Sequence, residues 1–490
     1  MRSPRNWFFL ALCLLVPLQI GFVARDDWFT LPPKPAGDGP DYENIAYQLS
    51  RGEGWSFDWT DPRWRAPYID AERRLPNAPM SLNGEAQLPA SYAIQLARRD
   101  GLSATTARPP LLPALIALVY WVLERGPVAF ATVRIVLACC IAVAGAVAVA
   151  MTARLANILT TSTWTIVLAS IVTLVLACLD RTVRSYATDF LTEPLALLLL
   201  QLWLWCICEL LNVFEPQMRV STNRTSEKRV RALATLSGIL LALLIYARSA
   251  IVLWLPGVWL LLFLVWSFRP RANDSLGERR ETASYDRRRA YLVATRVVLV
   301  CLLACAPWWL RNSAVLETWM PLGTQGATTL VGGYSDESLA HRGEWQSEPE
   351  IRLRRRVENE LSTDEGRSLP RREVRVANAA SDQVRSWIAM HIRDLPKLAW
   401  YRLVNEWNPY TGRALVWKLA ALLGLVYLAI RLPVAAIVIG GVILINTLMV
   451  VVLYSVGGRF LVPTYGMLYT LAGLGVASIP MALLRLKTRA

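Results

Sequence analysis

An acidic residue, Asp41, stands at the start of a short amphipathic segment, GPDYENIAYQLSRGEGW, that follows the first apolar run of the chain. The apolar residues of this segment recur at the spacing of one helix face, and Gly52 follows as a stop: Tyr42, Ile45, Ala46 and Leu49. Helix capping is one explanation of Asp41, because aspartate is a favoured N-cap residue. General-base chemistry is the other, because a carboxylate within hydrogen-bond reach of a hydroxyl can take its proton.

Further ionisable residues stand at the ends of other apolar runs: Arg108, Asp189, Glu193, Arg248 and Arg459. Charges at membrane depth are costly and tend to mark a functional site. Guanidinium groups bind phosphate through a planar fork, so the three arginines are candidate phosphate ligands. The two acids could orient an acceptor or help to hold a divalent ion. Arg108 could instead extend its side chain to the lipid headgroups. Glu193 could instead occupy the first turn of a helix beside Pro194, where the helix dipole favours an acid.

The composition predicts a polytopic membrane protein. The chain has 490 residues, of which 54% are hydrophobic, and many of its apolar runs are long enough to cross a hydrocarbon core of about 30 Å. We expect about ten spans, near residues 7–23, 129–150, 161–179, 191–212, 231–247, 250–267, 291–310, 414–430, 433–453 and 460–483. The run at 7–23 reads as a retained anchor, with a cleaved signal peptide as the alternative.

The distribution of arginine and lysine predicts the topology. When the spans alternate, the basic loops 213–231 and 268–290 and the basic C-terminal tail fall on one side, which the positive-inside rule assigns to the cytoplasm. We therefore expect a multi-pass plasma (inner) membrane protein with both termini in the cytoplasm. Two long extracytoplasmic segments remain, and the chain divides into an anchor, a first outer segment, a central bundle, a second outer segment and C-terminal helices: 1–23, 24–128, 129–310, 311–413 and 414–490.

The outer segments are expected to form a small, mostly helical layer on the membrane. The stretch 110–124 is apolar but short for a span, so it predicts an interfacial helix.

Several other chemistries find no support in the sequence. It has no glycine loop ending in Gly-Lys-Ser/Thr, only two histidines and no Asp-x-Asp, which disfavours ATP hydrolysis, a histidine-based metal site or triad, and a metal-bound nucleotide sugar.

The order of several short motifs resembles that of a known family. The chain carries the acid-Tyr-x-x-x-Ala-x-x-Leu-x-x-Gly segment that begins at Asp41, then ARPPLLP with Arg108, then TEPL with Glu193, then PWWLRN followed by the glycine-rich PLGTQGATTLVGGY. This order is similar to the GT-C membrane glycosyltransferases, in particular the subgroup of protein O-mannosyltransferases and the lipid A aminoarabinose transferase. One departure is that members of that family often carry paired acids in the first outer loop, whereas Asp41 is followed by Tyr42.

The resemblance implies an all-α bundle of about ten spans and inverting transfer of a sugar from a polyprenyl phosphate to an acceptor hydroxyl on the outer face. In that interpretation Asp41 is the general base, and the arginines bind the phosphate of the donor. The expected partners are the lipid-linked sugar, membrane lipids and an acceptor that is a protein, lipid or glycan, and nucleic acid is not among them. Members of the family differ in metal dependence, so the resemblance leaves a divalent ion open as a cofactor.

Two alternatives concern the base and the function. The adjacent pair Asp26 and Asp27 could supply the base in place of Asp41. A lipid-linked sugar flippase or another secondary transporter would share the number of spans and an arginine-lined groove, but it would show broken helices and inverted repeats, which the sequence lacks. The identity of the sugar and of the acceptor cannot be derived from the sequence, although the second outer segment is expected to decide the acceptor.

Overall fold

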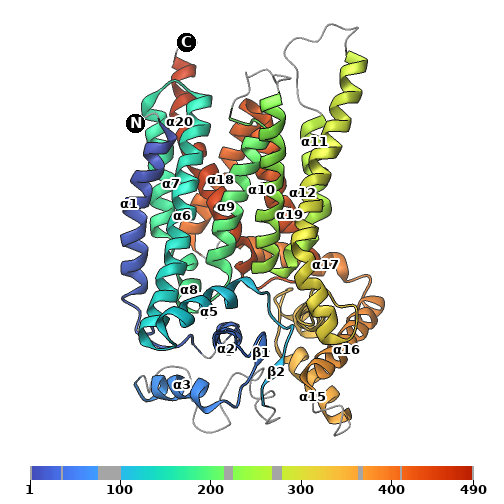
Figure 1. The fold of residues 1–490 in the computed structure, drawn as a ribbon. Helices are drawn as coiled ribbons and strands as arrows, with labels where there is room; N and C mark the ends of the chain where they lie inside the picture. The colour runs from blue at the N-terminus through green and yellow to red at the C-terminus, as the bar shows by residue number, and fades with distance from the viewer. Residues whose placement is uncertain are drawn as a thin grey trace.

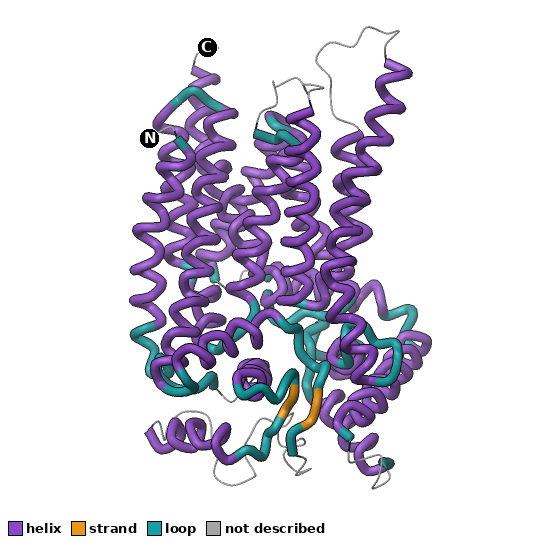
Figure 2. The backbone as a smooth tube through the Cα atoms, in the orientation of Figure 1, coloured by secondary structure: helices purple, strands orange, loops and turns teal. Residues whose placement is uncertain are grey.

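The computed structural model is a helical bundle with a layer of short helices at one end (Figures 1 and 2). It describes residues 3–34, 37–74, 101–214, 224–267, 279–361, 368–408 and 411–487. Among these residues the strands are limited to one antiparallel pair, β1 (Ser56–Phe57) and β2 (Ser103–Ala104). The prediction of an all-α polytopic membrane protein with a small, mostly helical outer layer is confirmed.

Nine helical segments of the described chain are long and apolar enough to cross a membrane. They belong to α1 (Pro4–Val23), α6 (Pro127–Leu159), α9 (Glu193–Leu210), α10 (Arg224–Ala247), η2 (Ser249–Trp254) with α11 (Leu255–Ser267), α12 (Arg279–Leu316), α18 (Gly412–Arg431), α19 (Pro433–Val452) and η4 (Arg459–Thr464) with α20 (Tyr465–Lys487). A tenth is formed by α7 (Thr163–Leu179) and α8 (Arg181–Thr188), which are bent by 43° at their junction. These segments overlap all ten predicted spans, but α6 continues nine residues past the predicted end at 150, and α8 ends nine residues past the predicted end at 179.

The two ends of the bundle differ in content. The N-terminus of α1 and the C-terminus of α20 lie at one end, together with the junctions from α9 to α10 and from α11 to α12 (Figure 1). These junctions contain the predicted basic loops 213–231 and 268–290, of which residues 215–223 and 268–278 lie outside the described part of the chain. The short elements that the structure describes in the two long segments, 24–128 and 311–413, both lie at the opposite end, as the sequence predicts for segments that share one side of a membrane.

The outer layer is built from two groups of short elements. The first segment contributes α2 (Gly39–Ser50), β1, α3 (Pro62–Arg74), β2 and α5 (Leu111–Leu123). The helix α5 is the predicted interfacial helix, and it crosses the end of the bundle in Figure 1. The second segment contributes α13 (Gln325–Gly333), α14 (Asp336–Ala340), α15 (Glu348–Glu360), α16 (Leu369–Met390) and α17 (Leu395–Trp407).

The helix α2 is fixed by a buried polar cluster around Glu43. The Glu43 carboxylate is fully buried and accepts hydrogen bonds from Tyr68, Tyr120 and Trp64, and it pairs with Arg125 at 2.6 Å. Because a buried charge is tolerated only when it is paired and hydrogen-bonded, these four partners set the position of the helix. The cluster joins α2 to α3, to α5 and to the residues before α6.

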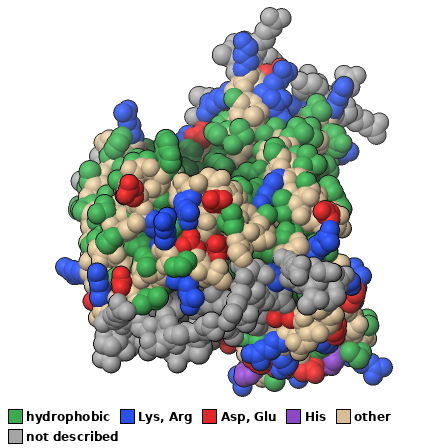
Figure 3. Space-filling model, turned by 60° about the horizontal axis from the view of Figure 1, so that its bottom comes forward, with side chains coloured by type: hydrophobic (Ala, Val, Ile, Leu, Met, Phe, Trp, Pro, Cys, Tyr) green, Lys and Arg blue, Asp and Glu red, His purple; other side chains and the backbone are tan. Residues whose placement is uncertain are grey.

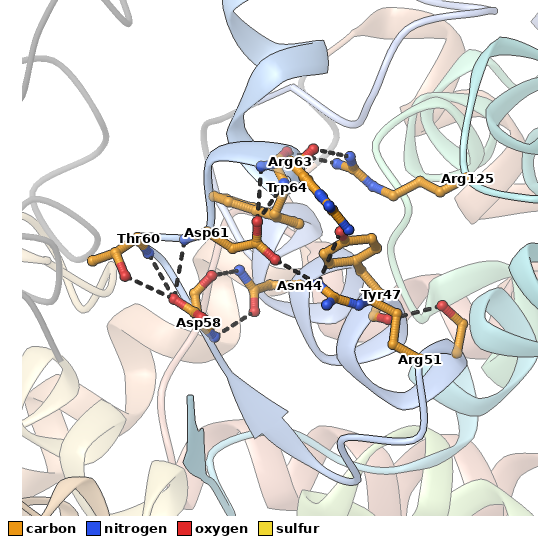
Figure 4. Close-up of polar contacts among 10 residues, drawn as sticks. Asn44, Tyr47, Arg51, Asp58, Thr60, Asp61, Arg63, Trp64 and Arg125 are labelled. Carbon is orange, nitrogen blue, oxygen red and sulfur yellow. Dashed lines mark hydrogen bonds and ion pairs between the residues drawn. The ribbon is translucent and has the colours of Figure 1, made fainter. Parts of the chain in front are cut away.

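A second set of polar contacts ties α2 to the chain that follows it (Figure 4). The Asn44 amide exchanges two hydrogen bonds of 3.0 Å with the backbone of Asp58. The Asp58 side chain accepts bonds from Thr60 and from the amide of Asp61, and Asp61 pairs with Arg51 at 2.8 Å. The middle and the C-terminal end of α2 are therefore tied to residues 58–61.

Candidate functional site

A cavity of about 800 Å³ lies between the outer layer and the outer ends of the spans. Its walls come from both outer segments, from the junction of α10 with η2 and from the loop before η4. On one side the lining is apolar, with Ala250, Val252, Leu253 and Phe460. On another side α15 and α16 contribute charged residues, among them Arg354 and Glu373. Figure 3 shows acidic and basic side chains side by side on this end of the molecule, with a largely hydrophobic bundle wall behind them.

Alternating acids and arginines form a continuous chain of ion pairs at the membrane side of the cavity. The Nε atom of Arg108 donates to Asp41 at 2.7 Å, and its Nη2 atom lies 2.8 Å from Asp38. The other carboxylate oxygen of Asp38 lies 2.9 Å from Nη2 of Arg459. Arg459 also pairs with Glu193, which lies 2.9 Å from Nη1 of Arg248. The order is Asp41, Arg108, Asp38, Arg459, Glu193, Arg248.

Local sequence explains how the acidic members of this chain are placed. The helix α2 begins at Gly39 with Asp38 as its N-cap residue and Pro40 in its first turn. Asp41 therefore lies inside the first turn, and the explanation of Asp41 as the N-cap is wrong. Glu193 is the first residue of α9, where Pro194 follows and the helix dipole favours an acid.

The arginines stand where helices break or begin. Arg108 precedes two prolines that lead into α5, and Arg248 separates α10 from the 3-10 helix η2. Arg459 opens η4 after Gly457 and Gly458, whose φ angles of 52° and 82° suit glycine. From these points each arginine reaches a carboxylate of another element, on α2, on α9 or in the residue before α2.

The surroundings of Asp38 and Tyr42 determine their protonation states. Burial by itself raises the pKa of Asp38, but the charges of Arg108 and Arg459 and their hydrogen bonds outweigh burial and hold that pKa well below its usual range. Burial raises the pKa of the Tyr42 phenol, whose ring lies 5.5 Å from the guanidinium carbon of Arg108. Asp38 is thus ionised and Tyr42 is neutral at physiological pH.

Four of the predicted residues, Asp41, Arg108, Arg248 and Arg459, line the same cavity. The structure brings them together from positions that are distant in the sequence, while their chemical roles stay predictions. Glu193 belongs to the ion-pair chain but is fully buried beneath the lining.

The remaining predicted acids lie elsewhere. Asp189 is not part of the cavity lining, and it pairs with Lys34 at 3.3 Å. Burial raises the pKa of Asp189, and Lys34 opposes that shift. Asp26 accepts a hydrogen bond from the amide of Trp28, and neither Asp26 nor Asp27 lines the cavity. These positions give no support to the alternative base.

Sequence reasoning missed Asp38, although a signal for it was present. Asp38 and Asp41 are three residues apart, a spacing that places two side chains on one face of a helix. It also missed the support for Arg459. Arg402 on α17 donates to the carbonyls of Val451 and Gly333, and Glu406 on the same helix accepts from Ser455. These contacts hold the loop that leads to Arg459.

In the part of the chain that the structure describes, no three His, Cys, Asp or Glu side chains are grouped so that they could hold a metal ion. A divalent cofactor stays a prediction that these residues do not support.

Comparisons with known proteins give a distant structural likeness. No family model matches the sequence, and no curated protein matches it. The oligosaccharyltransferase AglB of Archaeoglobus fulgidus, in complex with an inhibitory peptide and a dolichol-phosphate, is 14% identical over 99% of this chain and 51% of its own, with a TM-score of 0.49. The apo form of the oligosaccharyltransferase from the same organism is 13% identical over 98% of this chain and 52% of its own, with a TM-score of 0.48.

The chain spans about half the length of these solved structures. At these identities and TM-scores, an activity for this chain has to rest on its own residues.

Proposed function

We propose that this protein is an inverting GT-C glycosyltransferase that moves a sugar from a polyprenyl-phosphate donor to an acceptor hydroxyl on the extracytoplasmic face. The observation that carries the proposal is the cavity itself, whose lining brings Asp41 and Asp38 together with three arginines at the end of a membrane bundle. A negatively charged lipid headgroup and a hydroxyl nucleophile are the reactants that such a set of groups suits.

The groups have distinct roles in the proposed reaction. The acceptor oxygen attacks the anomeric carbon, and the bond from that carbon to the phosphate oxygen breaks with its electron pair leaving on the phosphate. Asp41 takes the proton of the acceptor hydroxyl. Arg108, Arg248 and Arg459 stabilise the charge that develops on the leaving phosphate. Attack from the face opposite the phosphate inverts the anomeric configuration.

The two kinds of cavity wall suit the two substrates. The apolar side at Ala250, Val252 and Leu253 suits the hydrocarbon of the donor, and Leu253 is itself about half exposed on the bundle surface. The charged side formed by α15 and α16 suits a polar acceptor. The second outer segment then selects the acceptor, and the first outer segment carries the base. The basic loops at the far end support cytoplasmic termini and a plasma-membrane location.

Transfer by the purified full-length protein tests the proposal. The protein is reconstituted in vesicles with a short-chain polyprenyl-phosphate sugar labelled in the sugar, and a pool of candidate acceptors is added on one side. Appearance of the label in acceptor, with release of polyprenyl phosphate, is the expected result. Movement of the labelled lipid between leaflets without transfer would overturn the proposal in favour of a flippase.

A further inference from the structure

Asp38 is an N-cap residue whose side chain does not cap its helix. Its backbone precedes α2, yet the carboxylate makes no capping hydrogen bond to the first turn. Its two oxygens instead lie 2.8 Å from Arg108 and 2.9 Å from Arg459. An aspartate at this position would ordinarily satisfy a free amide of the helix. The Asp38 carboxylate therefore contacts the two arginines in place of the helix amides.

The two arginines are held by Asp38 in the way that a phosphate would hold them. One carboxylate bridges two guanidinium groups, one on each oxygen, and a phosphate with two free oxygens makes the same pair of contacts. Asp38 also lines the cavity, and a quarter of its side chain is exposed. A phosphate that enters the cavity therefore meets the arginines and their existing anion together.

The charges of the ion-pair chain are balanced before any ligand binds. Its three carboxylates belong to Asp38, Asp41 and Glu193, and its three guanidinium groups belong to Arg108, Arg248 and Arg459. Each of the arginines already contacts at least one carboxylate. An incoming phosphate must replace some of these contacts, so its affinity is a difference between two sets of ion pairs.

We propose that Asp38 is a built-in counter-anion that competes with the substrate phosphate for Arg108 and Arg459. The inference rests on the proposed function for the identity of the phosphate. Asp38 keeps its charge throughout the physiological range, because Arg108 and Arg459 lower its pKa although burial alone would raise it. The competition is therefore always present.

Such competition matters most after transfer. The donor phosphate is a diester with one negative charge, whereas the released polyprenyl phosphate is a monoester whose charge is about −1.5 to −2 at pH 7. The product binds arginine more strongly than the donor does, so the reaction tends to trap it. An aspartate that returns to both arginines weakens product binding and speeds release.

Substitution of Asp38 by Asn tests the proposal. If Asp38 competes with phosphate, the variant binds phosphate more tightly, whereas loss of a merely structural residue would not strengthen binding. The Asp38 side chain makes no capping hydrogen bond that would be lost, and asparagine is as good an N-cap residue as aspartate, so α2 is expected to persist. Farnesyl phosphate serves as the product probe, with binding to the full-length protein in detergent followed by calorimetry. We expect Asp38→Asn to bind the probe about 10-fold more tightly, because one competing charge is lost. In turnover, kcat and the donor KM should both fall and inhibition by farnesyl phosphate should increase.

Controls separate this effect from a change in overall charge. Asp382→Asn makes the same charge change on an exposed part of the outer layer, where Asp382 has only a 3.8 Å contact with Arg385, and it should leave the affinity unchanged. Asp38→Glu restores the charge and should bind the probe less tightly than Asp38→Asn. Asp38→Ser is measured in parallel, because serine also caps helices and replaces Asn as the test if that variant does not fold.

The outcomes distinguish the two proposals. If wild-type protein transfers sugar but neutral variants at Asp38 bind the probe equally or more weakly, the counter-anion role is overturned and Asp38 only positions the arginines. If no variant transfers sugar but the neutral variants bind the probe more tightly, the counter-anion stands and the glycosyltransferase proposal fails. Tighter binding together with slower turnover supports both.

Discussion

The two outer segments lie at the same end of the bundle but contribute different things to the cavity. The first segment places charged groups directly in the ion-pair chain, namely Asp38, Asp41 and Arg108. The second segment contributes none of the six members of that chain. It supplies walls from α13, α15 and α16, and its helix α17 supports the loop that leads to Arg459.

This difference suggests a division of labour within one cavity. A reaction that is common to many acceptors needs a fixed base and fixed phosphate ligands, and the rigid cluster around Glu43 holds the first segment in place. Recognition of a particular acceptor needs a wall that can differ between relatives. We therefore expect substitutions in the first segment to affect the chemical step and donor, and those in the second to affect the acceptor.

The largest expected effect is at the proposed base. Asp41→Asn keeps an oxygen that can accept a hydrogen bond from Arg108 but cannot take a proton. Turnover of sugar transfer should fall by a factor on the order of 100 to 10,000, the usual contribution of a positioned general base. Donor binding, measured as affinity for a non-reacting donor analogue, should persist.

The control for this substitution is Asp26→Asn, which removes an acid of the same segment that does not line the cavity. Its turnover should match wild type. If Asp41→Asn kept wild-type turnover and Asp26→Asn lost it, the general base would belong to the pair Asp26 and Asp27 and not to Asp41. Loss in both would indicate that the first segment is sensitive to any substitution of its acids.

A matched pair of arginine substitutions compares the two segments directly. Arg108 and Arg354 both line the cavity, and each pairs with a carboxylate of its own segment, Asp41 and Glu350 respectively. Arg108→Gln should raise the donor KM roughly 10- to 100-fold, because a charge-assisted contact to phosphate is lost. Arg354→Gln should leave the donor KM unchanged and raise the acceptor KM by roughly 3- to 10-fold. Steady-state kinetics with each substrate varied in turn gives both constants.

Equal effects of the two substitutions on the donor KM would contradict the division of labour, since both walls would then contact the phosphate. Arg385→Gln is a suitable control, because Arg385 lies on α16 with 81% of its side chain exposed. It removes the same charge from the second segment without altering the cavity.

Much of the candidate site was accessible to sequence reasoning, for a physical reason. Charges beside apolar runs are costly at membrane depth, so Asp41, Arg108, Arg248 and Arg459 stood out against their surroundings. The order of the spans followed from length and hydropathy in the same way, including the short α5. Both kinds of prediction depend on local contrast, which a single sequence contains.

The parts that were missed depend on contacts between distant residues. Asp38 looks like an ordinary turn residue in GDGPD, and its partners Arg108 and Arg459 come from about 70 and 420 residues further along the chain. The side chains of Arg402 and Glu406 are buried on a helix that reads as merely amphipathic. The same holds for Glu373, whose partners lie more than 250 residues earlier in the first segment and at Thr324. No local sequence pattern predicts such pairings between distant residues.

The smallest expected effect concerns the joint between the two segments, at Glu373. Its carboxylate accepts hydrogen bonds from Thr105 at 2.7 Å and from Thr106 and Thr324 at 3.2 Å, so α16 is tied to the residues around β2. Burial raises the pKa of Glu373, and these hydrogen bonds only partly oppose the shift. The folded state therefore binds this proton at pH values where the unfolded state has released it.

The sign of the pH dependence follows from this raised pKa. Between the ordinary Glu pKa of 4.5 and the raised folded value, the unfolded state binds fewer protons, so the stability contributed by Glu373 falls as pH rises. Gln cannot titrate, and its amide protons face hydroxyl and amide donors, which costs about 1 kcal/mol. Glu373→Gln should be less stable than wild type at pH 4, and the difference should shrink towards pH 8. Thermal unfolding in detergent across this range measures it, with Glu317→Gln, which removes the same charge at an exposed position, measured in parallel. A difference that grows with pH would instead mean that the Glu373 carboxylate is stabilised as an ion, because the hydrogen bonds from Thr105, Thr106 and Thr324 would then outweigh its burial.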